Sequence, residues 1–282
     1  MSGRLDVKKT HKLYVGGQFP RSESGRTFPA LDADGAVMAR MSLASRKDLR
    51  DAVRVARGAQ SGWAGRTGYN RGQILYRIAE MVEERSSIFA GQLREAGSSK
   101  RQADAEVAAT VDRLVWYAGW CDKYAQVMGN LNPVAGPFFN ISVPEPSGVV
   151  GVIAPAEPAL LGLVSRVAPP LVTGNTVIVV ASETRPVPAI AFAEALATSD
   201  VPGGVVNILT GSPRELAPWL ADHMDVNVLD VAGAPTDMLA DLETASAENM
   251  KRIVKGATTD VQSPYLIAEF TETKTVWHPK GV

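Results

Sequence analysis

Short, mainly apolar runs in the second half of the chain constrain its fold most strongly. Four such runs follow one another: Val149–Ala154, Thr176–Val180, Val205–Thr210 and Val226–Val231. Three segments with a helical pattern separate them: 159–172, 189–198 and 214–223. Apolar strands of this kind are buried on both faces, and strands that alternate with helices form parallel sheets with right-handed crossovers. The sequence therefore predicts an α/β fold, a Rossmann-like parallel sheet with helices on both faces.

The regions on either side of this sheet have other patterns. The sequence divides into four parts: N-terminal strands and helices at 1–136, a β-arm at 137–148, the Rossmann-like core at 149–256, and a linker and terminal strand, expected to serve in oligomerisation, at 257–282. Tyr14–Phe19 is read as a strand, a Gly-Gly turn and a return strand. From Arg46 onward apolar residues recur every three or four positions, as in amphipathic helices, and the last and longest of these is predicted at 103–127.

The terminal strand lacks an obvious partner. Residues 265–277 are β-prone, and no helix follows them. A strand that left its edge unpaired would promote aggregation. We therefore expect this strand to find its partner in another subunit of an oligomer.

Composition narrows the classes of function. Lys and Arg total 29 against 30 for Asp and Glu, so no basic field favours nucleic acid. The residues MSGRLDVKKTHK contain no apolar secretory segment, and the apolar runs are too short to span a membrane. The single cysteine, Cys121, is typical of a reducing compartment, so a cytoplasmic location is expected. One cysteine and three scattered histidines do not form a metal-binding pattern, and no metal is expected.

Six short motifs occur along the chain in the order found in one known family. They are Tyr14–Gly17, Trp116–Trp120, Glu145–Pro155, Gly174–Val177, Pro202–Asn207 and Lys274–Trp277. Each motif alone is weak, but the shared order is specific, and the chain resembles the aldehyde dehydrogenase superfamily. The resemblance implies a scaffold for NAD(P)-dependent aldehyde oxidation, in which a cysteine thiol attacks the aldehyde and hydride passes to the nicotinamide.

The resemblance also indicates a missing part. Met250–Val254 resembles the last strand before the catalytic domain of that family, yet the terminal strand at Phe270–Trp277 follows almost at once. No room remains between them for a catalytic domain. The chain is therefore identified as a short, degenerate, pseudoenzyme-like member that lacks the catalytic domain and the catalytic cysteine.

The positions that match the family's catalytic residues carry other side chains. The general base matches Gly256, and the oxyanion-stabilising asparagine matches Glu157, whose carboxylate would repel the developing charge. Cys121 lies in a predicted helix, away from the nucleophile's position. His223 is read as the C-terminal residue of a helix rather than as a base. We therefore expect no catalytic residues and no enzyme activity from this chain alone.

The ribose-binding motif is partly retained. The family's Lys-Pro-Ser-Glu, whose lysine and glutamate hold the adenosine ribose, becomes Val180-Ala181-Ser182-Glu183. The lysine is lost, while Ser182 and Glu183 remain as candidate cofactor-binding residues. Both can equally serve to end a strand.

The glycine turn that approaches the pyrophosphate is altered as well. Its first glycine, Gly233, is kept and is the third candidate cofactor-binding residue. Met238 replaces the second glycine, and Asp237 adds a negative charge near the phosphates. We therefore expect no bound cofactor, with only weak affinity for NAD or NADP.

Two hypotheses from different classes remain open. In the first, the chain is a non-catalytic structural or regulatory subunit. It would form a homo-oligomer, or a hetero-oligomer with a full-length catalytic aldehyde dehydrogenase, because its arm and terminal strand resemble the family's assembly elements. In the second, it is an NAD(P)-binding aldehyde oxidoreductase family protein with an altered site built from Glu157, Ser182 and Glu183. Neither hypothesis involves nucleic acid or a membrane.

The loss of the catalytic domain predicts an exposed patch. Four apolar residues lie at the carboxyl end of the first sheet strand, where that domain would meet the cofactor fold: Ala156, Pro158, Ala159 and Leu160. An exposed apolar patch usually marks an interface, so we expect these residues to contact another subunit.

Overall fold

A five-stranded parallel sheet forms the centre of the molecule in a computed structural model, which describes residues 7–256 and 262–281. Its strands are β6 (Val149–Ile153), β7 (Thr176–Val180), β8 (Val206–Leu209), β9 (Val228–Asp230) and β10 (Arg252–Val254). They run in the order β10-β9-β6-β7-β8, and all pairs are parallel. The predicted α/β fold with a Rossmann-like parallel sheet is confirmed.

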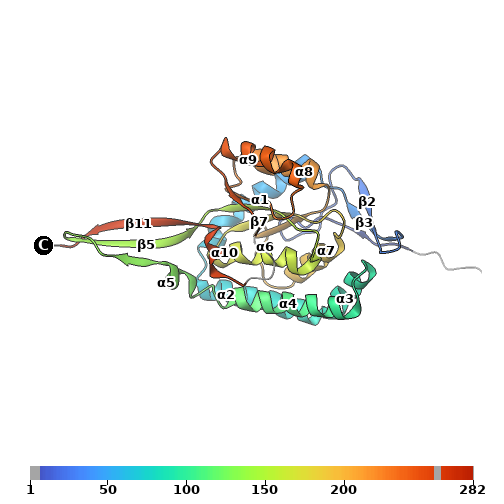
Figure 1. Ribbon diagram of the computed structural model, residues 1–282, viewed down its shortest axis with the longest axis horizontal. Helices are drawn as coiled ribbons and strands as arrows, with labels where there is room; N and C mark the ends of the chain where they lie inside the picture. Colours follow the sequence, from blue (N-terminus) through green and yellow to red (C-terminus); the bar gives the residue numbers. More distant parts are fainter. Residues whose placement is uncertain (1–6, 257–261, 282) are drawn as a thin grey trace, which may run out of the picture.

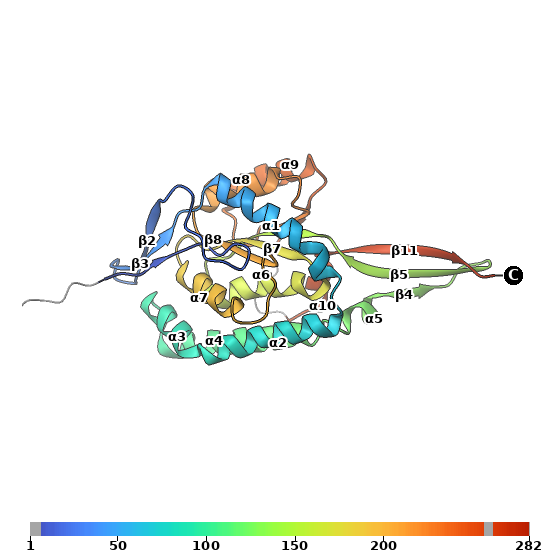
Figure 2. The same ribbon diagram turned by 180° about the vertical axis from the view of Figure 1, so that it is seen from behind.

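Helices cover both faces of this sheet, as Figures 1 and 2 show. One face carries α1 (Arg46–Ala64), α8 (Pro213–Asp222) and α9 (Leu239–Ala247). The other carries α2 (Gly68–Glu84), α3 (Ser86–Glu95), α4 (Lys100–Ala118), α6 (Ala159–Thr173) and α7 (Val187–Leu196). Successive residues of β7 point to opposite faces, so Val177 and Val179 join one hydrophobic core while Ile178 and Val180 join the other. This double burial explains why the strands read as continuous apolar runs.

Local sequence signals set several element boundaries. Gly174 ends α6 in the left-handed conformation, with φ of 104°, and Gly16 and Gly17 form the predicted tight turn with φ of 65° and 78°. The helix predicted at 103–127 is wrong in its extent, because α4 ends at Ala118 and a turn at Gly119 separates it from α5 (Tyr124–Met128).

A small sheet near the N-terminus was not predicted from the sequence. Its strands β1 (Thr10–His11), β2 (Thr27–Leu31) and β3 (Val37–Ser42) run in the order β1-β3-β2. It lies at the end of the body opposite the arm (Figure 1).

The arm is a separate three-stranded sheet that projects from the body (Figures 1 and 2). Its strands β4 (Asn130–Asn132), β5 (Phe138–Pro146) and β11 (Thr271–Pro279) run in the order β11-β5-β4. We expected the terminal strand to pair with a strand of another subunit, and this is wrong for the edge of β11 that faces β5. β11 pairs antiparallel with β5 of the same chain along its whole length, from Thr271 opposite Pro146 to Pro279 opposite Phe138.

Short elements complete the fold. The 3₁₀ turn η1 (Thr236–Met238) precedes α9, and α10 (Pro264–Ala268) precedes β11. The predicted linker at 257–261 and the first six residues lie outside the described residues. Within the described residues, no helix combines the length and apolar character needed to cross a bilayer.

Candidate functional site at the carboxyl edge of the sheet

The loops that follow the parallel strands meet at one edge, and in open α/β sheets this carboxyl edge is where ligands bind. Five segments form it here: 154–158 after β6, 181–185 after β7, 210–213 after β8, 231–238 after β9 and 255–256 after β10. All three candidate cofactor-binding residues lie on these segments, as do Glu157 and Gly256. Cys121 and His223 do not.

Ser182 and Glu183 are engaged in contacts within the protein. The Ser182 hydroxyl is buried and accepts a hydrogen bond from the backbone N–H of Arg185 at 3.1 Å, which stabilises the turn after β7. Glu183 is exposed, and its Oε2 accepts a hydrogen bond from the Ser212 hydroxyl at 3.1 Å. Neither contact is with the other candidate residues.

Gly233 is required by packing against the neighbouring loop. Its backbone N–H donates to the Ile153 carbonyl at 2.9 Å, and a Cβ at this position would collide with the carbonyl of Ala154. Any larger residue would force the loops after β6 and β9 apart. The glycine is therefore explained by the approach of two loops, without a ligand.

Asp237 is paired with an arginine that the sequence reading did not single out. Arg214, in the first turn of α8, donates from Nη1 to Asp237 Oδ2 at 2.8 Å and from Nη2 to Oδ1 at 3.0 Å. The hydrogen bonds from Arg214 lower the pKa of Asp237. The expected unbalanced negative charge is thus neutralised. Because both side chains are exposed, water screens the pair and it stabilises the edge little.

The N-terminus of α6 is already capped by a carboxylate. Glu106 on α4 accepts hydrogen bonds at Oε1 from the backbone N–H groups of Leu160 at 2.7 Å and Leu161 at 3.2 Å. These first-turn N–H groups are the ones that would otherwise attract an anion to a helix start. The first helix after β6 therefore has two of its donors occupied from within the chain.

The exposed apolar patch expected at this edge is absent among the described residues. Ala159 and Leu160 are the first two residues of α6 and are buried in the core. Of the four residues, only Ala156 and Pro158 retain exposure. The adjacent Glu157 carboxylate instead forms an ion pair of 2.8 Å with Arg185. The patch prediction is wrong because α6 turns its first apolar residues into the core and charged residues face the solvent.

The position that matches the family's general base is sterically closed. A Cβ on Gly256 would lie 2.5 Å from Nη2 of Arg166 and 2.8 Å from Cβ of Ala232. Arg166 comes from the middle of α6 and is almost completely buried. A glutamate side chain at position 256 could not enter this space unless Arg166 moved.

A buried ion pair lies directly beside this position. Nη1 of Arg166 is 3.5 Å from Oδ2 of Asp230, and both side chains are inaccessible to solvent apart from 2% of Arg166. Burial raises the pKa of Asp230 to about 6, although Arg166 and the N–H of Ala232 act in the opposite direction. Sequence reasoning missed both residues, because Arg166 sits within an apolar helix pattern and Asp230 within an apolar strand run.

Cys121 lies outside this edge and is not activated. It follows α4 near the base of the arm, is 5% exposed, and packs against the first turns of α2 at Gly68 and Gly72. Burial raises the pKa of its thiol to about 12. A thiol acts as a nucleophile through its thiolate form, which this environment suppresses.

A dinucleotide would need groups that this edge does not offer it. The ribose would need the Glu183 carboxylate, which already accepts from Ser212, and a cation where Val180 stands. The pyrophosphate would need a glycine turn, where Met238 packs against the core beside α9. The cations Arg185, Arg214 and Lys255 are already paired with Glu157, Asp237 and Glu243. As they stand, these residues do not fit the phosphates of a dinucleotide.

Comparison with known proteins identifies the relatives of this chain. The model of the aldehyde dehydrogenase family matches residues 20–276. The chain is 30% identical over 253 residues to the putative aldehyde dehydrogenase DhaS of Bacillus subtilis, covering 88% of this chain and 50% of that protein. It is 31% identical over 256 residues to the cytosolic 10-formyltetrahydrofolate dehydrogenase of Pongo abelii, covering 88% of this chain and 28% of that protein.

Solved structures agree with these matches. A putative aldehyde dehydrogenase from Burkholderia cenocepacia superposes with a TM-score of 0.82 and 29% identity, over 86% of this chain and 50% of that one. An NAD+ complex of an aldehyde dehydrogenase from Bacillus cereus gives a TM-score of 0.81 and 27% identity, over 87% and 50%. The chain thus spans about half the length of these proteins and of DhaS.

Proposed function

The chain belongs to the aldehyde dehydrogenase family, and we propose that it is a non-catalytic subunit with a structural or regulatory role. In this proposal it assembles with copies of itself and with a full-length catalytic aldehyde dehydrogenase. It would not oxidise aldehydes alone. Ser182, Glu183 and Gly233 would be remnants of a cofactor site with little remaining affinity for NAD or NADP.

The observation that carries the proposal is the closed base position. Arg166 fills the space next to Gly256, so the step that needs a base has neither a carboxylate nor room for one. The only cysteine has its thiol pKa raised to about 12 and lies away from the carboxyl edge. Glu157, at the oxyanion position, is a hydrogen-bond acceptor that is paired with Arg185. Each of the three chemical roles is therefore unsupported.

The arm supports the assembly part of the proposal. Cross-strand partners share a face, so Leu131 and Val276, which both lie opposite Ile141, point to the same side as that residue. Phe139 and Val143 lie two residues before and after Ile141 in β5, so their side chains point to the same side. All five side chains are between 37% and 68% exposed. We call this set the apolar arm face.

The opposite side of the arm combines a polar cluster with two exposed aromatic rings. Asn132 donates to Asn140 at 2.6 Å and to the Ser142 hydroxyl at 2.8 Å, and Ser142 in turn contacts Thr275 at 2.8 Å. Trp277, opposite Asn140, and Phe138 lie on the same side and are exposed. Exposed apolar side chains on a projecting sheet are typical of a surface that packs against another protein. The outer edge of β11 also remains available for strand pairing.

Two measurements test the proposal. The purified chain is incubated with NAD+ or NADP+ and a panel of aldehydes, and no NAD(P)H is expected. Turnover that is lost in Cys121→Ser would overturn the non-catalytic role. The chain is then co-expressed in turn with each full-length aldehyde dehydrogenase found in its source genome. Native mass spectrometry is expected to show a complex containing both; a chain that stays monomeric alone and in co-expression contradicts the assembly.

The alternative is an NAD(P)-binding protein with an altered site at Glu157, Ser182 and Glu183. Calorimetry distinguishes it from the non-catalytic subunit by measuring the dissociation constant for NAD+ or NADP+. Loss of one charge-assisted hydrogen bond, such as the one from the missing lysine, lowers affinity by roughly ten- to a hundredfold. A micromolar dissociation constant for NAD+ or NADP+ with the isolated chain would favour the alternative. Weak or absent binding favours the subunit.

A further inference from the structure

A hollow lies between the first turns of α1 and the last turn of α8. Its volume is about 740 Å³, and its lining residues include Arg46, Lys47, Arg50, Leu49, Trp219 and His223, with Glu23 and Asp222 at its sides. We name it the α1–α8 hollow. We propose that it binds a small organic anion, one carboxylate or phosphate group on an apolar body. This proposal is independent of the proposed subunit function.

Arg46 is the group that would bind the anion. Its guanidinium carbon lies 3.6 Å from the centroid of the Trp219 ring, a stacked cation–π arrangement. This contact holds the guanidinium over the indole face, and cation–π contact does not use its N–H groups as hydrogen-bond donors. Among the described residues, Arg46 has no hydrogen-bond acceptor and no ion-pair partner. Arginine held in this way presents a planar fork that matches a carboxylate or phosphate.

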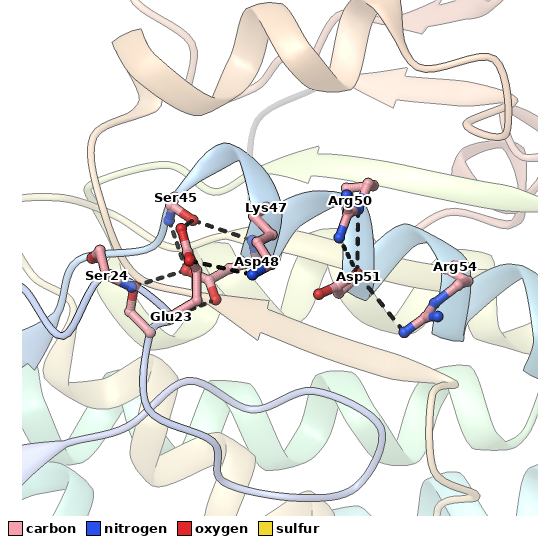
Figure 3. Close-up of polar contacts among 9 residues, drawn as sticks. Glu23, Ser24, Ser45, Lys47, Asp48, Arg50, Asp51 and Arg54 are labelled. Carbon is pink, nitrogen blue, oxygen red and sulfur yellow. Dashed lines mark hydrogen bonds and ion pairs between the residues drawn. The ribbon is translucent and has the colours of Figure 1, made fainter.

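The neighbouring cations differ from Arg46 because each already faces a carboxylate. Lys47 Nζ lies 3.5 Å from Glu23 Oε2, and Arg50 donates from Nε and Nη2 to Asp51 Oδ1 at 3.3 and 3.0 Å (Figure 3). Each pair is neutral overall and holds its side chains in place. Arg46 is therefore the arginine of the lining that has no carboxylate partner among the described residues.

The N-terminus of α1 itself is not the binding element. Its N-cap Ser45 accepts from the N–H of Asp48, and the Asp48 carboxylate accepts from the N–H of Ser45 at 2.8 Å (Figure 3). This capping box occupies two backbone donors of the first turn, the N–H groups of Ser45 and Asp48. The Arg46 guanidinium supplies the charge for recognition, which makes binding sensitive to its substitution.

The charges and the apolar walls define the class of ligand. Glu23 and Asp51 neutralise Lys47 and Arg50, so Arg46 is the cation that remains for a ligand with a single anionic group, and Asp222 is the lining carboxylate that opposes it. His223 adds no charge near neutral pH, because burial lowers its pKa, and its Nδ1 accepts from the N–H of Asp225 at 3.2 Å. Trp219 and Leu49 supply an apolar surface for the body of the ligand.

The test follows the indole N–H signal of Trp219 by NMR in the full chain, with the signal assigned from its loss in Trp219→Phe. Benzoate, acetate and inorganic phosphate are titrated separately against sodium chloride at equal ionic strength. We expect saturable shifts with benzoate, weaker ones with acetate, and none with chloride. Phosphate saturating more tightly than benzoate would assign the site to phosphate-bearing ligands, and the reverse order to carboxylates.

Two variants on the same helix complete the test. Arg46→Gln is expected to weaken benzoate or phosphate binding by about tenfold or more, as for loss of a charge-assisted hydrogen bond. Arg54→Gln removes an exposed charge outside the hollow and is expected to leave binding unchanged. The proposal is overturned if no probe gives a saturable shift, or if both variants weaken binding to the same extent.

Discussion

The guanidinium of Arg166 occupies the space that a side chain at position 256 would need, with its Nη2 only 2.5 Å from an ideal Cβ on Gly256. The arginine comes from α6, and its Nη1 lies 3.5 Å from Asp230 Oδ2. A larger side chain at position 256 would therefore have to displace a buried arginine from its contact with Asp230.

Gly256→Ala should destabilise the protein by about 1–3 kcal/mol, the usual cost of forcing extra atoms into a packed region. Gly58→Ala is the matched control, because that glycine lies inside α1 with open space around it. There, alanine should stabilise by about 0.5–1 kcal/mol through its better helix propensity. Urea unfolding measures the change in unfolding free energy for both variants. If Gly256→Ala leaves that free energy unchanged, the Arg166 side chain can move aside at little cost.

Asp230 should make stability depend on pH. Burial raises the folded pKa of Asp230 to about 6, above the ordinary aspartate value of 3.8, so the folded state binds the proton more tightly. The resulting stabilisation is fully present below pH 3.8 and is lost as the pH rises through 6. It amounts to at most about 3 kcal/mol. The difference in unfolding free energy between wild type and Asp230→Asn should therefore change between pH 4 and 7. Parallel pH profiles for the two proteins would contradict this assignment.

Cys121 should resist thiol reagents in the folded protein. Its raised pKa of about 12 leaves almost no thiolate near neutral pH, and the side chain is 5% exposed. Modification by a chromogenic disulfide should be slow in buffer and fast in urea. Fast reaction of the native protein would show that the turn after α4 opens readily.

The apolar arm face should control the oligomeric state. Val276→Glu places a charge on that face, whereas Thr273→Glu places the same charge on the same strand opposite Pro144, on the other face. Light scattering should show that only Val276→Glu shifts the protein to smaller species. Equal effects of the two substitutions would implicate the outer edge of β11 instead of the face.

The strand and helix alternation was readable because each strand is buried on both faces, as β7 shows with its residues divided between two cores. The hairpin of β2 and β3 was missed although Asp34-Gly35 marks its turn, since the flanking residues do not alternate clearly. Boundaries that depend on one glycine, such as Gly174, were predicted well. The extent of α4 was not, because the continuing apolar pattern concealed the turn at Gly119.

The candidate site was harder to predict than the fold. Sequence motifs located the loops at the carboxyl edge but could not show which side chains of these loops contact one another. Arg214 facing Asp237 and Glu106 capping α6 join segments that are distant in sequence. The same limit led to the wrong expectation for β11, whose partner β5 lies in the same chain. Contacts between residues that are far apart in the sequence can be identified only from the folded structure.

The arm also fixes when a binding-competent molecule can exist. Its two long strands, β5 and β11, lie on either side of the whole parallel sheet in sequence. During synthesis β5 emerges early but remains without its central neighbour until residue 279 has been made. A chain that has not been synthesised as far as β11 therefore has no finished arm. A ribosome stall before Thr271 would leave the edge of β5 that β11 covers open to the wrong strand, which makes synthesis of β11 a condition for an ordered arm.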